Sequence, residues 1–149
     1  EQGWPSLVTM RGRILFSLLE GGVHRDKYLD GAPSLENRLF FVDANGPEDA
    51  HAAVFKINDA RSESERVADL VSRGFVVTCN TDAADAGDEE NAQKLAGSLA
   101  SGVNFLSSDR PGPTDEVDYW FDLPAGEPAR CNPVHAPPEC TSADIETTP

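Results

Sequence analysis

The segment Ser107-Ser108-Asp109-Arg110 places two hydroxyls, an acid and a base directly after an apolar run, and Pro111 ends it. The apolar run, residues 103–106, predicts a buried strand, so these polar groups would stand at the end of that strand. Other predicted strands also end in polar residues: Leu19-Glu20, Val42-Asp43, Ile57-Asn58-Asp59 and Asn80-Thr81-Asp82. A rim of this kind can bind a ligand, although a solvent-facing rim is often polar without one.

Lys56 stands out because it lies inside an apolar strand, Val54-Phe55-Lys56-Ile57. A lysine that points toward the carboxyl edge of a sheet loses hydration unless it faces an anion, so one interpretation is a contact with an anionic ligand. The alternative is that the side chain points outward and lies between helices, with its ammonium group in water.

Cys131 and Cys140 enclose a Pro-rich loop that has no means of forming regular structure. Such a pair predicts a disulfide and an oxidising compartment. A zinc site built from Cys131, His135 and Cys140 is an alternative that lacks an evident fourth ligand. Cys79 lies in an apolar run and is interpreted as a buried thiol.

Two helix–glycine–strand units follow each other in the middle of the chain. In the first, Ser62 and Glu65 form a capping-box pattern, and Gly74 ends a helix before a strand over residues 75–79. The apolar stripe of this helix comprises Val67, Leu70 and Val71. In the second unit Asp88 caps a helix that Gly102 ends, and its predicted stripe comprises Ala92, Leu95, Ala96 and Leu99. Repeated units with apolar strands are typical of a parallel sheet covered by helices.

The remaining elements are predicted from shorter patterns. Further strands are expected over residues 13–19, 39–42 and 53–57, and residues 4–10 resemble the end of a helix that Gly12 stops. Apolar residues alternate over residues 117–123, which predicts an edge strand. The polar tail, residues 141–149, is predicted to be disordered.

Composition excludes several classes of partner. The net charge is −14, with 26 acidic residues against 12 basic ones, which argues against binding to nucleic acid or to an anionic membrane through bulk charge. No apolar run is long enough to cross a bilayer. A chain of 149 residues fits one domain with a modest core.

The order of the segments resembles one family. The stretches RGRILFSLLEGG, RDKYL, VFKIND, RGFVV, LASGVNFLSSDRP and PARCNP are similar to the C-terminal half of the calcium-dependent, secreted phosphatidylinositol-specific phospholipase C-like phosphodiesterases. The resemblance extends from about residue 4 to residue 140. It implies the C-terminal half of a (β/α)8 barrel over residues 1–111, with an edge strand and a disulfide-closed extension over residues 112–140.

The resemblance also implies roles for rim residues. Lys56, Asn80 and Arg110 would bind the phosphate or inositol of a phospholipid or glycerophosphodiester. Asp109 would orient a histidine or hold calcium, although it can equally cap the turn before Pro111. Glu20 is a possible calcium ligand, with most other ligands outside this chain; otherwise it is a solvated loop acid.

The resemblance implies that the catalytic histidines come from an N-terminal barrel half or a second polypeptide. The histidines of this chain, His24, His51 and His135, match no family motif and are interpreted as solvated residues. Relatives tend to carry arginine where this chain has Asn80, and tyrosine where it has Arg110, so the phosphate contact would be altered. Two hypotheses therefore remain: half of a secreted phosphodiesterase, or a non-catalytic domain derived from the barrel.

Overall fold

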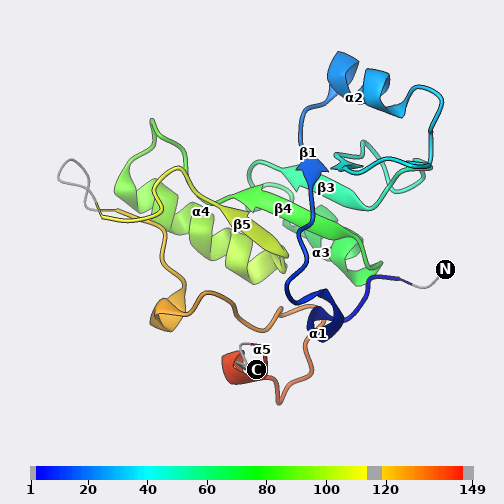
Figure 1. The fold of residues 1–149 in the computed structure, drawn as a ribbon. Coiled ribbons are helices and arrows are strands. Elements are labelled where there is room, and N and C mark those ends of the chain that lie inside the picture. The colour runs from blue at the N-terminus through cyan, green and yellow to red at the C-terminus, as the bar shows by residue number, and fades with distance from the viewer. Residues whose placement is uncertain (1–2, 114–118, 146–149) are drawn as a thin grey trace.

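The computed structural model describes residues 3–113 and 119–145, and it contains a parallel sheet (Figure 1). The strands are β1 (Ser17–Leu18), β2 (Phe41–Val42), β3 (Val54–Ile57), β4 (Val76–Asn80) and β5 (Phe105–Ser107). β1 pairs with β2, and β3, β4 and β5 pair in that order, all in parallel. A single bridge between Asp43 and Val54 connects the two groups. The strands therefore lie side by side in chain order, as mixed α/β architecture with a parallel sheet predicts.

Helices connect most of the strands. The helical elements are α1 (Leu7–Met10), α2 (Gly22–Leu29), α3 (Ser64–Ser72), α4 (Asp88–Ser101), the short 3-10 turn η1 (Pro124–Gly126) and α5 (Ser142–Ile145). α2 lies between β1 and β2, α3 between β3 and β4, and α4 between β4 and β5. No helix in the described ranges has the length and apolar character that a membrane crossing requires.

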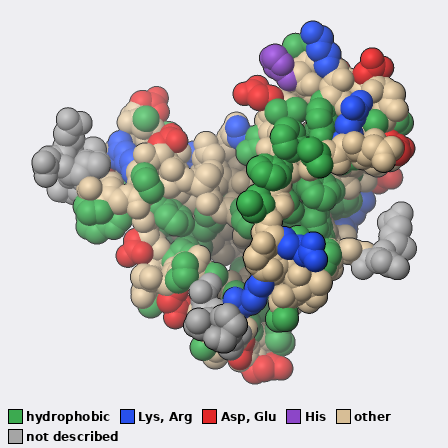
Figure 2. All heavy atoms as spheres, viewed as in Figure 1, with side chains coloured by type: hydrophobic (Ala, Val, Ile, Leu, Met, Phe, Trp, Pro, Cys, Tyr) green, Lys and Arg blue, Asp and Glu red, His purple; other side chains and the backbone are tan. Residues whose placement is uncertain are grey.

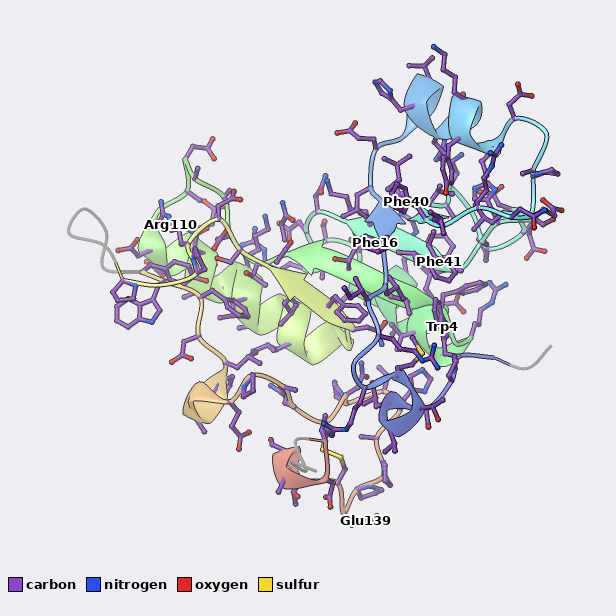
Figure 3. The ribbon with its side chains drawn as sticks, in the orientation of Figure 1. Trp4, Phe16, Phe40, Phe41, Arg110 and Glu139 are labelled. Carbon is purple, nitrogen blue, oxygen red and sulfur yellow. A yellow bond between two sulfur atoms is a disulfide. The ribbon has the colours of Figure 1, made fainter. Side chains whose placement is uncertain are left out.

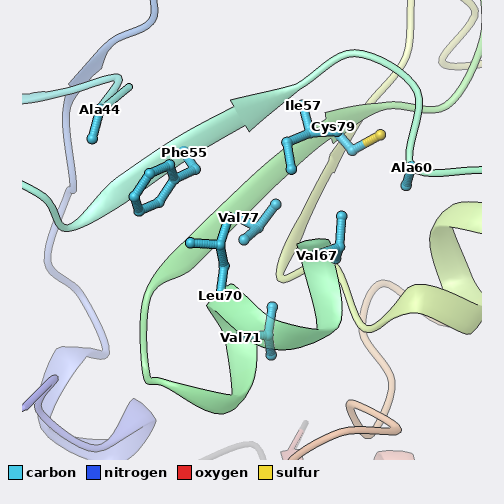
Figure 4. Packing of buried hydrophobic residues seen from close by; sticks show 9 residues of the cluster. All are labelled: Ala44, Phe55, Ile57, Ala60, Val67, Leu70, Val71, Val77 and Cys79. Carbon is cyan, nitrogen blue, oxygen red and sulfur yellow. The ribbon is translucent and has the colours of Figure 1, made fainter. Parts of the chain in front are cut away.

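The hydrophobic core lies between the sheet and α3 (Figure 4). Phe55 and Ile57 of β3 and Val77 and Cys79 of β4 face this core, as strand alternation requires. They pack against the predicted stripe of α3, which consists of Val67, Leu70 and Val71. The stripe prediction for this helix is confirmed.

The opposite face of the sheet is less covered, and we call it the open face. It carries the alternate residues of β3, β4 and β5: buried Val54 and half-buried Val76 near the start, and Lys56, Thr78, Asn80, Phe105 and Ser107 further along. Lys56 and Ser107 are exposed there, and the exposed fraction of Phe105 is 55%. The sheet thus has one apolar face under a helix and one face that turns polar toward the carboxyl ends of its strands.

The capping prediction for α3 is wrong. The helix begins at Ser64 with Glu63 at the cap position and no side-chain cap. The hydroxyl of Ser62 donates instead to the carbonyl of Asp59, 3.0 Å away. Gly74 does end the helix turn, with a positive φ of 85°. A Ser-x-x-Glu pattern within a serine-rich segment therefore predicts the helix but places its cap one position too early.

The predicted stripe of α4 is also wrong, and Gly87 rather than Asp88 occupies the cap position. The buried residues of α4 are Asn91, Ser98 and Ser101, whereas Ala92 and Ala96 are exposed. Small polar side chains can be buried here because the helix itself satisfies them: Ser98 donates to the carbonyl of Lys94, 3.0 Å away. Apolar periodicity cannot identify a buried face of this kind.

The C-terminal segment contains the predicted disulfide between Cys131 and Cys140, which leaves no thiol in this loop for the zinc alternative. Asn132 donates to the carbonyl of Gly102, 2.6 Å away, and the ring of His135 contacts the carbonyl of Val71. These carbonyls belong to the C-terminal ends of α4 and α3, so the disulfide loop covers both helix ends.

The rest of the C-terminal segment differs from its prediction. Tyr119 to Leu123 form no strand, while residue 117 lies outside the described ranges. Ser142–Ile145 form α5 where a disordered tail was expected, and Arg11 donates to the carbonyl of Ile145, 2.6 Å away. Residues 146–149 lie outside the described ranges.

Candidate functional site at the carboxyl edge of the sheet

The polar end of the open face forms the candidate site. Lys56 pairs in register with Thr78, and Asn80 pairs with Ser107, so these side chains lie on one face near one edge. The hydroxyl of Ser107 donates to Oδ1 of Asn80 over 2.8 Å. Because Oδ1 accepts this bond, the amide nitrogen of Asn80 is the group that it can offer to an anion.

Lys56 points away from the helical layer. Its strand neighbours Phe55 and Ile57 are buried against α3, and Lys56 is exposed on the open face. Its backbone N–H donates to Oδ1 of Asp43 over 2.7 Å, which places a carboxylate beside the strand. The alternative in which Lys56 lies between helices is therefore wrong.

Asp109 and Arg110 lie at the same edge, directly after β5. Asp109 is exposed, and Arg110 donates its backbone N–H to Oγ of Ser108 over 2.8 Å. Ser108 thus caps this turn in the manner expected of Asp109. Whether Asp109 orients a histidine stays a prediction.

The guanidinium of Arg110 is engaged within the protein (Figure 3). It lies 3.4 Å from Oδ1 of Asp88 and donates to the carbonyl of Ala84 over 3.1 Å, and its side chain is only 15% exposed. These contacts tie Arg110 to the loop before α4. The predicted substrate contact of Arg110 stays a prediction, and it would require Arg110 to leave these partners.

Glu20 is exposed in the short connection between β1 and α2. Calcium takes about six to eight oxygen ligands. Within residues 3–113 and 119–145, no group of three or more His, Cys, Asp or Glu side chains is arranged to hold a metal ion. The described residues therefore do not fit a calcium site by themselves, and Glu20 could act as a ligand only together with groups from elsewhere.

The histidines have different environments. His24 is exposed on α2, as expected. His51 is not a solvated residue: its side chain is largely buried, 3.8 Å from Asp49. His135 is exposed, as expected, although its ring contacts the carbonyl of Val71. The backbone N–H groups of Gly46 and Asn45 donate to the carboxylate of Asp49. These hydrogen bonds, with His51 nearby, lower the pKa of Asp49.

Sequence reasoning missed two acids as candidates, Asp43 and Asp82. Asp43 accepts the N–H of Lys56, and Asp82 accepts the N–H of Asp109 over 3.0 Å. Asp43 follows β2 directly and Asp82 follows β4 by two residues, and this position after a strand is the available sequence signal. Tyr119 lies near Asp82, and burial, followed by the negative charge of Asp82, raises the pKa of Tyr119.

Asp59, in the loop after β3, gives a pH-dependent contribution to stability. The side chain of Arg61 donates to both carboxylate oxygens, at 3.0 Å and 2.6 Å, and this lowers the pKa of Asp59. A lowered folded pKa stabilises the protein above the unfolded value, and the contribution is lost as the pH falls through the folded pKa. We expect Asp59→Asn to destabilise the protein by about 0.5 kcal/mol near pH 6 and by less near pH 3.

Urea denaturation at both pH values measures this effect. Asp85→Asn, which removes an exposed acid from a neighbouring loop, is the matched control. An equal loss from Asp59→Asn at both pH values would contradict the assignment.

The chain was compared with curated proteins, solved structures and family models. No curated protein and no solved structure matches the chain. A family model does match it, over residues 1–133, and its description is phosphoinositide phospholipase C, Ca2+-dependent. This match covers most of the 149 residues and includes every candidate site residue. The chain therefore belongs to the calcium-dependent phosphoinositide phospholipase C family.

Proposed function

We propose that this chain forms one wall of a site that cleaves phosphoric diesters, as the C-terminal half of a (β/α)8 barrel. The position of Lys56 carries the proposal: its exposed side chain lies on the open face opposite Thr78, which precedes Asn80 by two residues on β4. Parallel strands in chain order, with connecting helices, are what half of such a barrel requires. Barrel enzymes place their ligands at the carboxyl ends of these strands.

The wall supplies binding rather than proton transfer. The ammonium of Lys56 and the amide of Asn80 would contact the phosphate oxygens of a phospholipid or glycerophosphodiester. Cleavage also needs a general base and a general acid. None of His24, His51 and His135 lies in β3, β4, β5 or the segment Ser107–Arg110 that borders the candidate site. A second barrel half would supply the histidine pair and the calcium ligands.

The margins of the sheet support such a partner. β1 and β5 stand at the two ends of the strand order in the described residues. Hydrophobic side chains gather on the surface around β1 (Figure 2), where Ile14 and Phe16 are exposed, and Phe16 lies 5.6 Å from Phe40 between ring centres. A partner strand at β1 would extend the sheet and cover part of this surface. The disulfide supports a secreted location.

Replacement of Lys56 tests the proposed anion contact. We expect the chain to bind inorganic phosphate or inositol 1-phosphate, and Lys56→Met to weaken that binding about tenfold, because a charge-assisted hydrogen bond is lost. Isothermal titration calorimetry measures both affinities. Lys27→Met, which removes an exposed lysine from α2, is the control for net charge. Equal weakening by both variants would show that Lys56 has no special role.

A non-catalytic domain derived from the barrel is the second candidate. It is favoured by Asn80, which brings no charge, and by the engagement of Arg110 with Asp88 and the carbonyl of Ala84. An assay of phosphatidylinositol cleavage distinguishes the two functions. Turnover only when a family N-terminal half is fused or added would support the enzyme. No turnover in that fusion would support the binding domain.

A further inference from the structure

Asp82 carries a buried carboxylate that the anion contact of Lys56 and Asn80 does not use. It follows β4 by two residues, and its exposed fraction is 2%. Burial of a carboxylate is strongly unfavourable unless hydrogen bonds satisfy its oxygens. The partners of Asp82 therefore indicate why the charge is retained.

Both oxygens of Asp82 hold the segment that follows β5. Oδ1 accepts the backbone N–H of Asp109 over 3.0 Å, and Oδ2 accepts the hydroxyl of Ser108. The same hydroxyl oxygen accepts the backbone N–H of Arg110 over 2.8 Å. One carboxylate thus fixes three consecutive residues, directly or through Ser108.

Asp82 is itself held by α4. Oδ1 of Asn91, a buried residue of α4, accepts the N–H of Ala83 over 3.0 Å, and its amide nitrogen donates to the carbonyl of Ala83 over 3.3 Å. Lys94 donates to the carbonyl of Asp82 over 3.1 Å. These bonds connect the loop after β4 to a regular helix, so the carboxylate has a defined position.

The segment fixed in this way borders the candidate site. The carbonyl of Ser107 accepts the N–H of Thr81 over 2.8 Å, and the hydroxyl of Ser107 donates to Asn80. The backbone position of residues 107–110 therefore determines where the amide of Asn80 and the carboxylate of Asp109 stand. Asp82 is also absent from the core cluster that joins the sheet to α3.

We propose that Asp82 is a positioning residue, which aligns Asn80 and Asp109 at the carboxyl edge by holding the segment Ser107–Arg110. The identity of the ligand in this proposal rests on the proposed function. The ordering of the segment Ser107–Arg110 by Asp82 is independent of that function.

Hydrogen exchange and phosphate binding together test this role. In Asp82→Asn, we expect the amides of Asp109 and Arg110 to exchange about tenfold faster, because the first donates a hydrogen bond to Asp82 and the second donates to Ser108, which Asp82 holds. Amides of β4 such as Val77 should exchange at the wild-type rate. Phosphate affinity should fall about threefold, less than the roughly tenfold loss expected of Lys56→Met.

Two further variants keep the test decisive. Asp85→Asn removes an exposed acid from the same loop and should change neither measurement. Ser108→Ala removes the hydroxyl that lies between Asp82 and the amide of Arg110 but keeps the carboxylate of Asp82. It replaces Asp82→Asn in the test if that variant does not fold. It should accelerate the exchange of the Arg110 amide more than that of any other amide.

Unchanged exchange at residues 109 and 110 would overturn the proposal, and so would faster exchange with wild-type phosphate affinity. If the wild-type chain binds no phosphate, the proposed function fails. The exchange rates then decide the role of Asp82 alone.

Discussion

Phe55→Ala is expected to lower the free energy of unfolding by about 3–5 kcal/mol. Phe55 is 1% exposed in the core between β3 and α3, and its ring meets that of Phe75 edge-on, with 5.2 Å between centres. Truncation removes this apolar contact and leaves a cavity that the sheet cannot fill. Because a domain of this size is stable by about 5–15 kcal/mol in total, the loss is a large fraction.

Urea denaturation followed by circular dichroism measures this loss. Phe105→Ala is the matched control, because Phe105 is 55% exposed on β5 and should change stability by less than about 1 kcal/mol. Equal losses in the two variants would show that the core does not lie on the α3 side of the sheet.

Gly102→Ala is expected to destabilise the protein by about 2–4 kcal/mol, for two reasons that add. Gly102 ends α4 with a φ of 86°, a conformation that alanine adopts with strain. A methyl group there would also overlap Cγ2 of Val134 and lie 3.1 Å from Oδ1 of Asn132. The disulfide loop would have to move away from the end of α4.

Gly74→Ala separates the two causes. Gly74 has nearly the same φ, 85°, but an added methyl group would meet nothing within 4 Å. We expect only the conformational cost there, about 1–2 kcal/mol. If the two variants lose the same stability, the loop does not press on Gly102. Faster proteolysis within residues 131–140 in Gly102→Ala alone would support the contact.

The parallel sheet was predictable because its central strands are rich in apolar residues, and because β4 and β5 each follow a glycine that ends a helix. The outer strands were predicted too long: β1 includes only Ser17 and Leu18 of the predicted residues 13–19. The ends of an outer strand are set by backbone hydrogen bonds to a single neighbouring strand. The pattern of side chains carries little information about where those bonds stop. The face of α4 was misread because hydrogen bonds, rather than apolar area, bury Asn91 and Ser98.

The candidate site was predictable in part. Lys56 was a candidate because burial of a cation within an apolar strand is unfavourable. The strand register places it on the open face. Arg110 shows the limit of this reasoning, since a long side chain can reach Asp88 instead of a ligand. The partners of Asp82 depend on how the ends of β4 and β5 approach each other, which no local pattern reveals.

The burial of Cys79 protects its thiol from mispairing once the chain has folded. Its thiol lies 3.4 Å from the hydroxyl of Ser98, beneath α4, where an oxidant or another thiol cannot approach it in the folded chain. Any bridge between Cys79 and Cys131 or Cys140 would hold β4 away from the helix. Docking of α4 before the thiols are oxidised would exclude such bridges, and we expect a thiol–disulfide shuffling buffer to rescue any mispaired species that air oxidation of the denatured chain forms.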